Sequence, residues 1–492
     1  MSARSRTADD PSAVATRRPA RRRSIAVVAT AIPLAMVISV LAFANPAGPG
    51  DPASRSPAAK PDKALVAQGA YLARMGDCTA CHTAPGGKPF AGGLAIESPF
   101  GAIYSTNITP DKATGIGNYT RDEFAAALRK GIRADGKRLY PAMPYPAYAS
   151  ISDHDIDALY AYFMHGVAPV HHQPQQTDLG FPFNQRWTLM FWDWMFAGTP
   201  RSAPAPDGHD AVARGRYLVQ GLGHCGSCHT PRGLAFQSKA LDDGDPAFLS
   251  GAELNGWLAP SLRGKRTSSE ATAGDGLGGW SHEDIVNYLA TGRNAHAAVA
   301  GEMKSVVEHS TSHLNDADLN AIAAYLKTLP SHRAKPDQVG SNSSDARDTT
   351  QRLTKATDLS HGGRLYLDNC GACHFADGRG AKTVFPVLDG NSLINADNPT
   401  GLIHVILAGA QLPSTPGAPE SLMMPGFAWR LNDQDVATLA TFLRQAWGNK
   451  ASKVTARQVA DVRKKLGPDD MHGNGPDDPY PGLQMHADAE DD

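Results

Sequence analysis

The stretch Cys78-Thr-Ala-Cys81-His82 returns twice along the chain, as Cys225-Gly-Ser-Cys228-His229 and as Cys370-Gly-Ala-Cys373-His374. These three Cys-x-x-Cys-His motifs contain all six cysteines of the 492 residues. Two thiols three positions apart fit one turn of helix and can add to the two vinyl groups of a haem, and the histidine that follows reaches the iron. The sequence therefore predicts three covalently attached haems c, with His82, His229 and His374 as iron ligands.

Other uses of cysteine pairs fit this pattern less well. A structural zinc site needs four ligands and usually two neighbouring pairs, whereas these motifs stand far apart in the sequence. A thioredoxin-like pair requires a βαβ setting, but the residues around each motif have the pattern of short helices and loops. Structural disulfides occur in exported proteins, yet they do not explain a histidine directly after every pair.

Residues 1–63 have the composition of an export segment. Met1–Arg23 carries seven arginines, and Ile25–Ala44 contains twenty uncharged, mostly apolar residues. Positive charge stays on the cytoplasmic side, so the rest of the chain is expected at the periplasmic side of the inner membrane. The apolar run is long enough to remain as a membrane anchor, and Ala42-Phe-Ala44 also has the pattern of a signal-peptide cleavage site. A flexible linker rich in Pro, Ala and Gly follows up to residue 63.

The remaining chain predicts an all-α fold of three tandem cytochrome c domains, one around each motif. Each domain opens with a helix whose apolar residues recur at helical spacing. Each closes with a helix that starts at a polar residue, which is Ser152, Asn315 or Asn432. The long polar linker before the third domain predicts a closer association of the first two. The expected domains are 64–166, 210–330 and 358–447, with an aromatic strap at 167–209, a polar linker at 331–357 and a charged, disordered tail at 448–492.

A methionine in each domain is expected on the iron face opposite the histidine. Met143 is the only methionine between the first motif and the last helix of the first domain. Prolines on both sides of it predict an extended loop that holds the thioether over the haem.

The methionines of the other two domains leave alternatives open. Met303 is the candidate in the second domain, and His309 and His313 lie nearby as competing ligands. In the third domain Met424 directly precedes a proline, as a ligand on a tight loop would, and is preferred over Met423.

The strap contains an unusual aromatic segment. Phe181–Phe196 holds three of the seven tryptophans of the chain. Such a segment can pack in the cleft between the first two domains, or it can form a docking surface for a partner subunit or the membrane. The sequence leaves both interpretations open.

Four further stretches carry a resemblance to a known family. They are Tyr104-Ser-Thr-Asn-Ile-Thr-Pro-Asp111, Phe181-Pro-Phe-Asn184, Val307-Glu-His-Ser-Thr311 and Trp447-Gly-Asn449. With the three motifs at this spacing, residues 64–465 resemble the triple-haem cytochrome c subunits of bacterial membrane-bound dehydrogenases, of the gluconate, sorbitol, fructose, alcohol and aldehyde types.

The resemblance implies an electron-transfer subunit that is not catalytic alone. A partner subunit would oxidise the substrate with FAD or pyrroloquinoline quinone, a small third subunit can belong to the complex, and electrons would pass to ubiquinone. Members of the family commonly end in an amphipathic membrane-binding helix, whereas residues 450–465 here are highly charged, which shifts the expected anchor to 25–44.

Two other functions remain open. The chain could be a stand-alone multihaem cytochrome that delivers electrons to a terminal oxidase, or a multihaem peroxidase with a removable ligand at the second iron. The formal net charge of −2 argues against a nucleic-acid partner.

Overall fold

The structure is a computed structural model of the chain and describes residues 62–198, 205–206, 209–254, 256–264, 276–330 and 344–466. The expected signal or anchor at 25–44 and the part of the expected tail beyond 466 lie outside the described residues. Among the helices that the structure describes, none is both long and apolar enough to cross a membrane.

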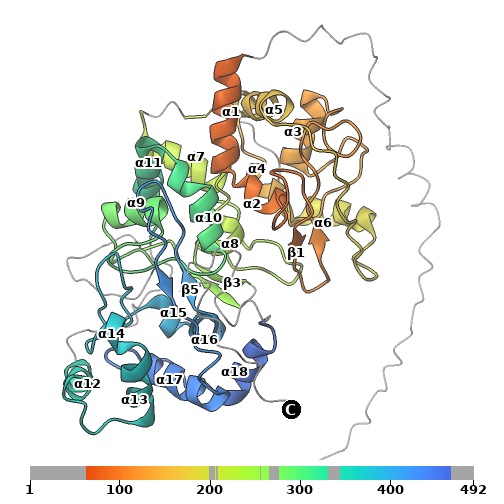
Figure 1. Cartoon of the computed structure of the whole chain (residues 1–492). Coiled ribbons are helices and arrows are strands. Elements are labelled where there is room, and N and C mark those ends of the chain that lie inside the picture. Colours follow the sequence, from red (N-terminus) through yellow and green to blue (C-terminus); the bar gives the residue numbers. More distant parts are fainter. Residues whose placement is uncertain are drawn as a thin grey trace, which may run out of the picture. The chain divides into compact units, whose positions relative to one another are not determined.

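The first repeat, residues 62–198, consists of short helices and one two-stranded hairpin (Figure 1). Its last long helix begins where the sequence predicts, because the Ser152 side chain accepts a hydrogen bond from the backbone N–H of Asp155. The elements are α1 (Lys63–Met75), α2 (Cys78–His82), β1 (Ala95–Ile96), β2 (Ile103–Tyr104), α3 (Arg121–Lys130), α4 (Tyr145–Tyr148), α5 (Asp153–His165), the 3₁₀ helix η3 (Arg186–Thr188) and α6 (Leu189–Phe196).

The second repeat, residues 209–330, has the same plan. Asn315 caps its last helix by accepting from the backbone N–H of Asp318, as predicted. The elements are α7 (Ala211–Gln220), α8 (Gly226–His229), β3 (Ala252–Leu254), β4 (Trp257–Ala259), α9 (His282–Thr291), α10 (Met303–His309), the 3₁₀ helix η4 (Thr311–His313) and α11 (Asp316–Leu326). Strands β3 and β4 pair antiparallel.

The third repeat, residues 344–466, again places the motif between two longer helices. Asn432 caps the second of them through the backbone N–H of Asp435, as predicted. The elements are α12 (Ser344–Lys355), α13 (His361–Asn369), α14 (Gly371–His374), α15 (Ser392–Asn395), α16 (Thr400–Ala408), β5 (Ala410–Gln411), β6 (Met423–Met424), α17 (Asp433–Gln445) and α18 (Ala456–Arg463). Strands β5 and β6 form an antiparallel hairpin.

Two expectations about the flanks of this repeat are wrong. The polar linker 331–357 ends in α12, whose Ala346 and Leu353 are buried in the third core. The charged tail 448–492 is folded up to residue 466, because α18 buries Val459 and Val462 in the same core. In both segments charged residues occupy the outer face of a helix, so their composition concealed a narrow apolar stripe.

Each repeat is closed by a helix pair that crosses at a glycine. A Cβ atom added to Gly69 in α1 would lie 1.9 Å from the Ala158 carbonyl oxygen in α5. A Cβ at Gly215 in α7 would lie 1.9 Å from the Ala321 oxygen in α11, and one at Gly362 in α13 would lie 2.7 Å from Phe442 Cβ in α17. These contacts leave no room for a larger residue, so the first glycine of each repeat sets the packing distance of its two helices.

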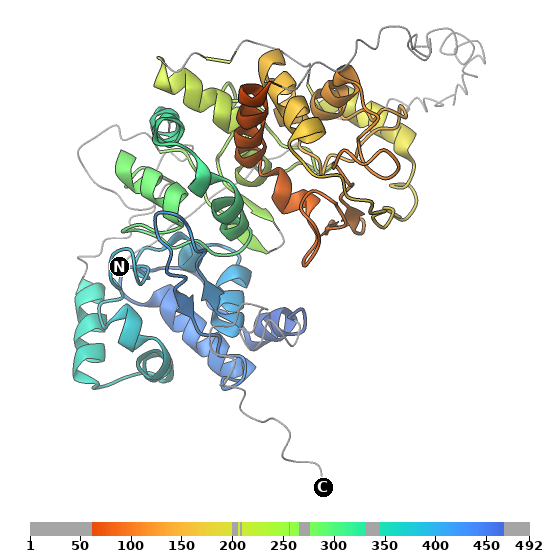
Figure 2. The same cartoon turned by 45° about the horizontal axis from the view of Figure 1, so that its top comes forward.

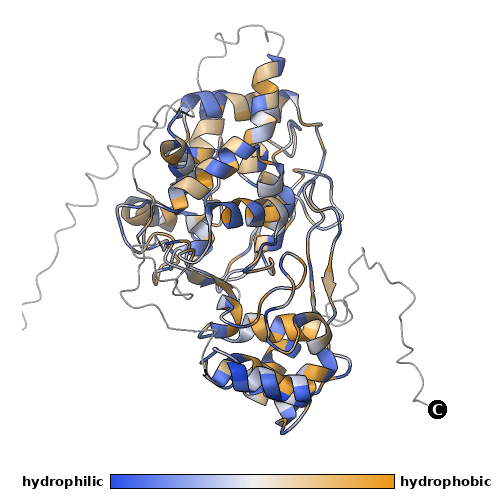
Figure 3. Cartoon of the chain, turned by 90° about the vertical axis from the view of Figure 1, so that its left-hand side faces the viewer, coloured by the Kyte–Doolittle hydropathy of each residue, from blue (hydrophilic) through white to orange (hydrophobic). Residues whose placement is uncertain are grey.

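Two large apolar cores hold the described residues together. The first core contains residues from the first and second repeats, such as Leu72, Leu159 and Leu218, and the second belongs to the third repeat. The predicted closer association of the first two repeats is thereby confirmed. The third repeat, teal to blue in Figure 2, forms its own cluster of helices, and Figure 3 shows apolar and polar faces on individual helices.

Candidate haem sites

All three motifs lie on one short helical turn that follows the first long helix of their repeat. The turns are α2, α8 and α14, and each ends at the motif histidine. All six cysteines are free, with no disulfide between them. The structure thus brings two thiols and one imidazole together at each predicted site.

The three motif histidines share one hydrogen-bond geometry. The Nδ1 atom of His82 lies 2.7 Å from the Thr106 carbonyl oxygen, that of His229 lies 2.7 Å from the Pro260 oxygen, and that of His374 lies 3.0 Å from the Pro386 oxygen. A carbonyl can only accept, so Nδ1 must carry the proton and Nε2 is left with its lone pair. This arrangement orients a histidine for iron ligation.

The electrostatics of the sites fit a neutral histidine ligand and argue against redox-active cysteine pairs. Desolvation lowers the pKa of each motif histidine, which keeps the imidazole neutral as a metal ligand must be. Burial also raises the pKa of Cys78, Cys225 and Cys370 to about 12. A thiol with so high a pKa forms little thiolate at neutral pH, which argues against a redox-active cysteine pair. The residues present therefore fit a covalently bound haem at each site.

The carbonyl partners come from loops that sequence reasoning did not assign. Thr106 lies within Tyr104–Asp111, one of the stretches that carry the family resemblance. Pro386 lies in a loop that is held by Trp447-Gly-Asn449, another of these stretches. Trp447 Nε1 donates to the Ala376 carbonyl, and Asn449 Nδ2 donates to the Leu388 carbonyl. A proline at two of the three partner positions, Pro260 and Pro386, was the available signal.

The expected axial methionines lie in different local structures. Met143 is in a turn, closed by its backbone N–H to the Tyr140 oxygen at 3.1 Å, so the predicted extended loop is wrong. A proline fixes only φ and is as compatible with a turn as with an extended chain. Met303 is the first residue of α10, and Met424 lies on β6.

The surroundings favour the expected choice of methionine. Met143 and Met424 pack against the apolar core of their own repeats. Met303 packs against a smaller cluster, whereas His309 and His313, the competing ligands, are exposed on the surface. Met303 and Met424 therefore remain our proposed ligands in the second and third repeats.

The first and second motifs lie against each other. The Met75 side chain packs on Gly223, and the Leu222 side chain packs on Gly76, so the residues just before each motif interlock. His224, which precedes Cys225, places its Nε2 atom 3.4 Å from the Gly76 oxygen. The two candidate haem sites are consequently neighbours.

A buried carboxyl group lies at this contact. Asp77 directly precedes Cys78, is 8% exposed, and has an Oδ1 atom without a hydrogen-bond partner. Burial raises the pKa of Asp77 to about 8. The group is thus largely protonated at neutral pH.

The second and third repeats meet through the β5–β6 hairpin. Leu412, which follows β5, is buried in one cluster with Val299 and Val307 of the second repeat, and Met303 packs against that cluster. The hairpin also carries Met424. The β5–β6 hairpin therefore connects the residues around Met303 with those around Met424.

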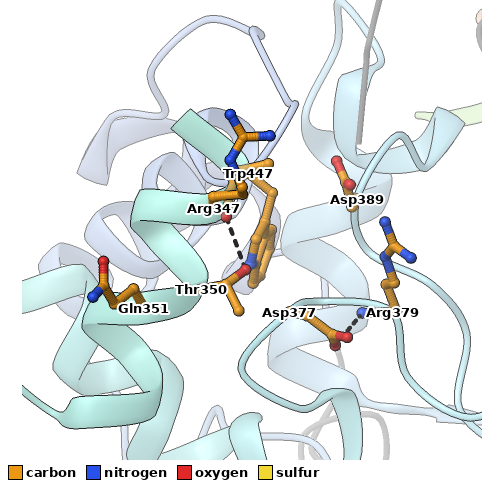
Figure 4. Close-up of a pocket in the computed structure, with 8 residues that line it drawn as sticks. Arg347, Thr350, Gln351, Asp377, Arg379, Asp389 and Trp447 are labelled. Atoms are coloured by element: carbon orange, nitrogen blue, oxygen red, sulfur yellow. Dashed lines mark hydrogen bonds between the residues drawn. The ribbon is translucent and has the colours of Figure 1, made fainter. Parts of the chain in front are cut away.

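A polar cavity of about 310 Å³ opens beside the third site (Figure 4). Asp377, Arg379 and Asp389 line it from the loop after His374, facing α12 and Trp447. Burial raises the pKa of Asp389. None of the proposed haem ligands lines this cavity, so it lies outside the haem site itself.

The aromatic strap is anchored on the first repeat by its charged side chains. Asp193 of α6 pairs with Arg138 and accepts a hydrogen bond of 2.5 Å from Tyr145. Arg186 donates to the Arg138 carbonyl at 2.7 Å and lies over the Tyr140 ring. The apolar side chains of the strap are largely exposed instead, up to 82% for Phe181 and Trp194, which favours the docking-surface interpretation over a strap packed in a cleft.

Comparisons with known proteins agree with these sites. The family model described as Cytochrome c matches residues 212–330 and 359–447, and the one described as Cytochrome C oxidase, cbb3-type, subunit III matches residues 64–163. The chain is 47% identical over 439 residues to the gluconate 2-dehydrogenase cytochrome c subunit of Pantoea cypripedii. The aligned region covers 88% of this chain and 94% of that protein.

Two further relatives are similar over most of their length. The cytochrome c subunit of the alcohol dehydrogenase (quinone) of Gluconobacter oxydans is 48% identical over 410 residues, covering 82% of this chain and 83% of that protein. The fructose dehydrogenase cytochrome subunit of Gluconobacter japonicus is 40% identical over 422 residues, covering 81% and 82%.

Proposed function

The chain belongs to the cytochrome c subunits of membrane-bound dehydrogenases and is an electron-transfer subunit, and from this premise we propose that three cytochrome c domains carry one covalent haem c each. The supporting observation is the shared geometry of His82, His229 and His374, whose Nδ1 atoms are bound to carbonyl oxygens while Nε2 remains available. The proposed thioether links are at Cys78, Cys81, Cys225, Cys228, Cys370 and Cys373.

Met143, Met303 and Met424 complete the proposed coordination of the three irons. Haem iron with histidine and methionine ligands supplies one-electron redox chemistry and has no open position for substrate. Burial keeps the histidine ligands neutral, and a methionine on the other face of the iron would leave no position for oxygen or peroxide. This coordination supports a carrier that is not catalytic alone.

The contacts between repeats support an order of the sites. The residues before the first and second motifs interlock at Gly76 and Gly223, and the β5–β6 hairpin joins the second and third methionine surroundings. Both contacts converge on the second repeat. We therefore propose that the second site is the middle of the relay.

The electron donor in this proposal is a dehydrogenase subunit that uses FAD or pyrroloquinoline quinone, and a small third subunit can complete the complex. The relatives' names support such a donor, since they are subunits of gluconate, alcohol and fructose dehydrogenases. The acceptor is ubiquinone or another component of the respiratory chain, reached at the periplasmic side of the inner membrane. The segment 25–44 is the proposed anchor or signal.

Deletion of the gene tests this function. Membranes from the deletion strain should lose oxygen uptake driven by a sugar, sugar acid, alcohol or aldehyde, while reduction of an artificial dye by the dehydrogenase subunit survives. Restoration by the wild-type gene, and failure of a variant with serine in place of Cys225 and Cys228, would connect the loss to a haem site. Unchanged uptake with every such substrate would contradict the proposal and favour a relay from periplasmic donors to a terminal oxidase.

A further inference from the structure

Exposed apolar side chains gather on one region of the described residues. Of the twelve large hydrophobic residues that are exposed there, nine lie in the strap or in the loop Leu234–Phe236 of the second repeat. Trp194 is 82% exposed and Leu234 fully exposed. Soluble surfaces rarely concentrate protruding apolar side chains in this way, so the cluster indicates a contact surface. We call it the aromatic patch.

The two parts of the aromatic patch are held together. Phe100 stacks on Phe183 of the strap with ring centroids 4.0 Å apart, and it contacts Phe236 of the loop edge-on at 5.4 Å. The Trp192 indole also donates to the Ala235 carbonyl at 2.9 Å. The strap and the loop thus form one fixed surface that spans the first and second repeats.

Helix α6 has its charged residue on the inner face and apolar residues on the outer face, the opposite of an ordinary surface helix. Its charged residue, Asp193, faces inward and is paired with Arg138 and Tyr145. Its outer face carries Met190, Phe191, Trp194 and Met195, all exposed. A helix on a water-facing surface normally has the opposite order, with charges outward.

We propose that the aromatic patch inserts into the interfacial zone of the lipid bilayer. Three observations favour lipid as the occupant. The side chains protrude from helix α6 and from a separate loop, the outer face of α6 carries no charge, and tryptophan is prominent in it. Indole rings prefer the membrane interface, and helices of this type bury their apolar face about 5–10 Å deep.

This inference rests on the proposed function and deepens it. Tyr140 and Tyr145 flank Met143 in sequence, and both contact the strap, through Arg186 and Asp193 respectively. Insertion of the aromatic patch would therefore bring the methionine side of the first site to the bilayer. A lipid-soluble quinone would be reached there without a membrane-spanning helix in the described residues.

A spin label on the full-length, haem-loaded chain tests the contact. Since every cysteine belongs to a motif, Met195→Cys gives a single free thiol for a nitroxide. In vesicles of phosphatidylethanolamine and phosphatidylglycerol, its collisions with a water-soluble nickel chelate should fall several-fold and its collisions with oxygen should rise. Ala317→Cys, exposed at the start of α11, is the control and should not change. Because the label reports only its own position, tethering by residues 25–44 cannot produce the result.

The other outcomes decide against the proposal. Equal nickel access at 195 and 317 in vesicles would overturn it. Protection at 195 that needs the dehydrogenase subunit and occurs without vesicles would assign the patch to protein docking instead. Met190→Cys, on the same outer face, repeats the measurement if the Met195→Cys protein lacks the wild-type visible spectrum.

A second readout separates this inference from the proposed function. The triple variant Phe181→Ser, Trp194→Ser, Leu234→Ser should accept electrons from the dehydrogenase in detergent at the wild-type rate but reduce quinone in vesicles several-fold more slowly. Trp429→Ser, which is 64% exposed in the third repeat, is the matched control. Wild-type protein that accepts no electrons would refute the function, whereas unimpaired quinone reduction by the triple variant would refute only the aromatic patch.

Discussion

The phenol of Tyr71 in the first repeat donates a hydrogen bond of 2.7 Å to the carboxylate of Asp318 in the second. The reciprocal bond also exists, since Tyr217 in the second repeat donates to Asp155 in the first at 2.6 Å. Both carboxylates are nearly inaccessible to water. The two repeats therefore exchange equivalent contacts, and each tyrosine reaches across to the first turn of the other repeat's last helix.

The first prediction concerns these two tyrosines. Tyr71→Phe should lower the free energy of unfolding by about 1.5 kcal/mol, the usual worth of a hydrogen bond to a charged group. Tyr217→Phe should cost more, because Asp318 keeps Arg214 at 2.8 and 2.9 Å, whereas Asp155 keeps the neutral amide of Gln68 at 3.2 Å. Thermal unfolding followed by circular dichroism measures both.

Tyr119→Phe is the control, because its hydroxyl makes no hydrogen bond in the described residues, and it should be neutral. Equal stability of all three variants would show that the reciprocal contact contributes nothing. An effect of Tyr71→Phe larger than that of Tyr217→Phe would contradict the role given to Arg214.

These tyrosines also show what sequence could and could not provide. Before the motif, the first two repeats read Gly69-Ala-Tyr-Leu72 and Gly215-Arg-Tyr-Leu218, whereas the third reads Leu365-Tyr366. This difference is visible in the sequence, and so are the motifs and helix caps. The reason was not visible: Tyr71 and Tyr217 face another repeat, while Tyr366 is buried in its own core and donates to Phe375. Local patterns determine where helices begin, but partners far apart in sequence are fixed only by packing.

The role of the stretch Val307–Thr311 also depends on contacts between residues far apart in sequence. It supported the family resemblance without a physical explanation. In the structure Val307 is buried beside Met303, and the Ser310 hydroxyl donates to the Met75 carbonyl at 3.2 Å. The stretch therefore connects the second methionine to the residues before the first motif, which no periodicity could reveal.

The second prediction is that Asp77 contributes stability that is lost as pH rises. Burial raises the pKa of Asp77 from an ordinary 3.8 to about 8. Between these values the folded protein holds a proton that the unfolded chain has lost, so the free energy of unfolding falls as pH rises through this window. The slope approaches about 1.4 kcal/mol per pH unit for one proton. In denaturant titrations between pH 4 and 8, the free energy of unfolding of wild type minus that of Asp77→Asn should therefore fall as pH rises.

If the wild type and Asp77→Asn had parallel pH profiles, the carboxyl group would not be protonated in the folded state. Asp122→Asn, at an exposed position in the first turn of α3, serves as the control for removing one negative charge. It should leave the profile unchanged.

The third prediction uses two adjacent glycines in α13. Gly362→Ala should destabilise the third repeat by about 1–3 kcal/mol, the usual range for overpacking. Its new Cβ would lie 2.7 Å from Phe442 Cβ, whereas at Gly363 the nearest atom is 3.5 Å away. Gly363→Ala should therefore stabilise the helix by up to about 1 kcal/mol. Thermal unfolding distinguishes the two variants, and equal effects would contradict the close crossing of α13 and α17.

The fourth prediction concerns the iron ligands. Oxidised protein should show near-infrared bands of methionine-to-iron charge transfer from all three sites. Met143→Ala, Met303→Ala and Met424→Ala should each remove one band, because each proposed thioether serves one iron. Met423→Ala is the matched control in the third repeat and should retain all bands. Loss of a band from Met423→Ala, with none from Met424→Ala, would reverse that assignment.

The last prediction tests the order of the relay. Met303→His should lower the potential of the second site, because a second histidine favours the ferric state relative to methionine. If the second site lies between the other two, as its contacts at Gly223 and Leu412 indicate, every electron must cross this raised barrier. Stopped-flow reduction by the dehydrogenase should then show one site reduced at the normal rate and the most distant site delayed. Met143→His and Met424→His are the comparison variants: a lower potential at the entry end should delay both other sites, and a lower potential at the exit end should delay neither. A Met303→His protein in which both neighbours are reduced at wild-type rates would mean that electrons pass between the first and third sites without the second, and the proposed order would have to be abandoned.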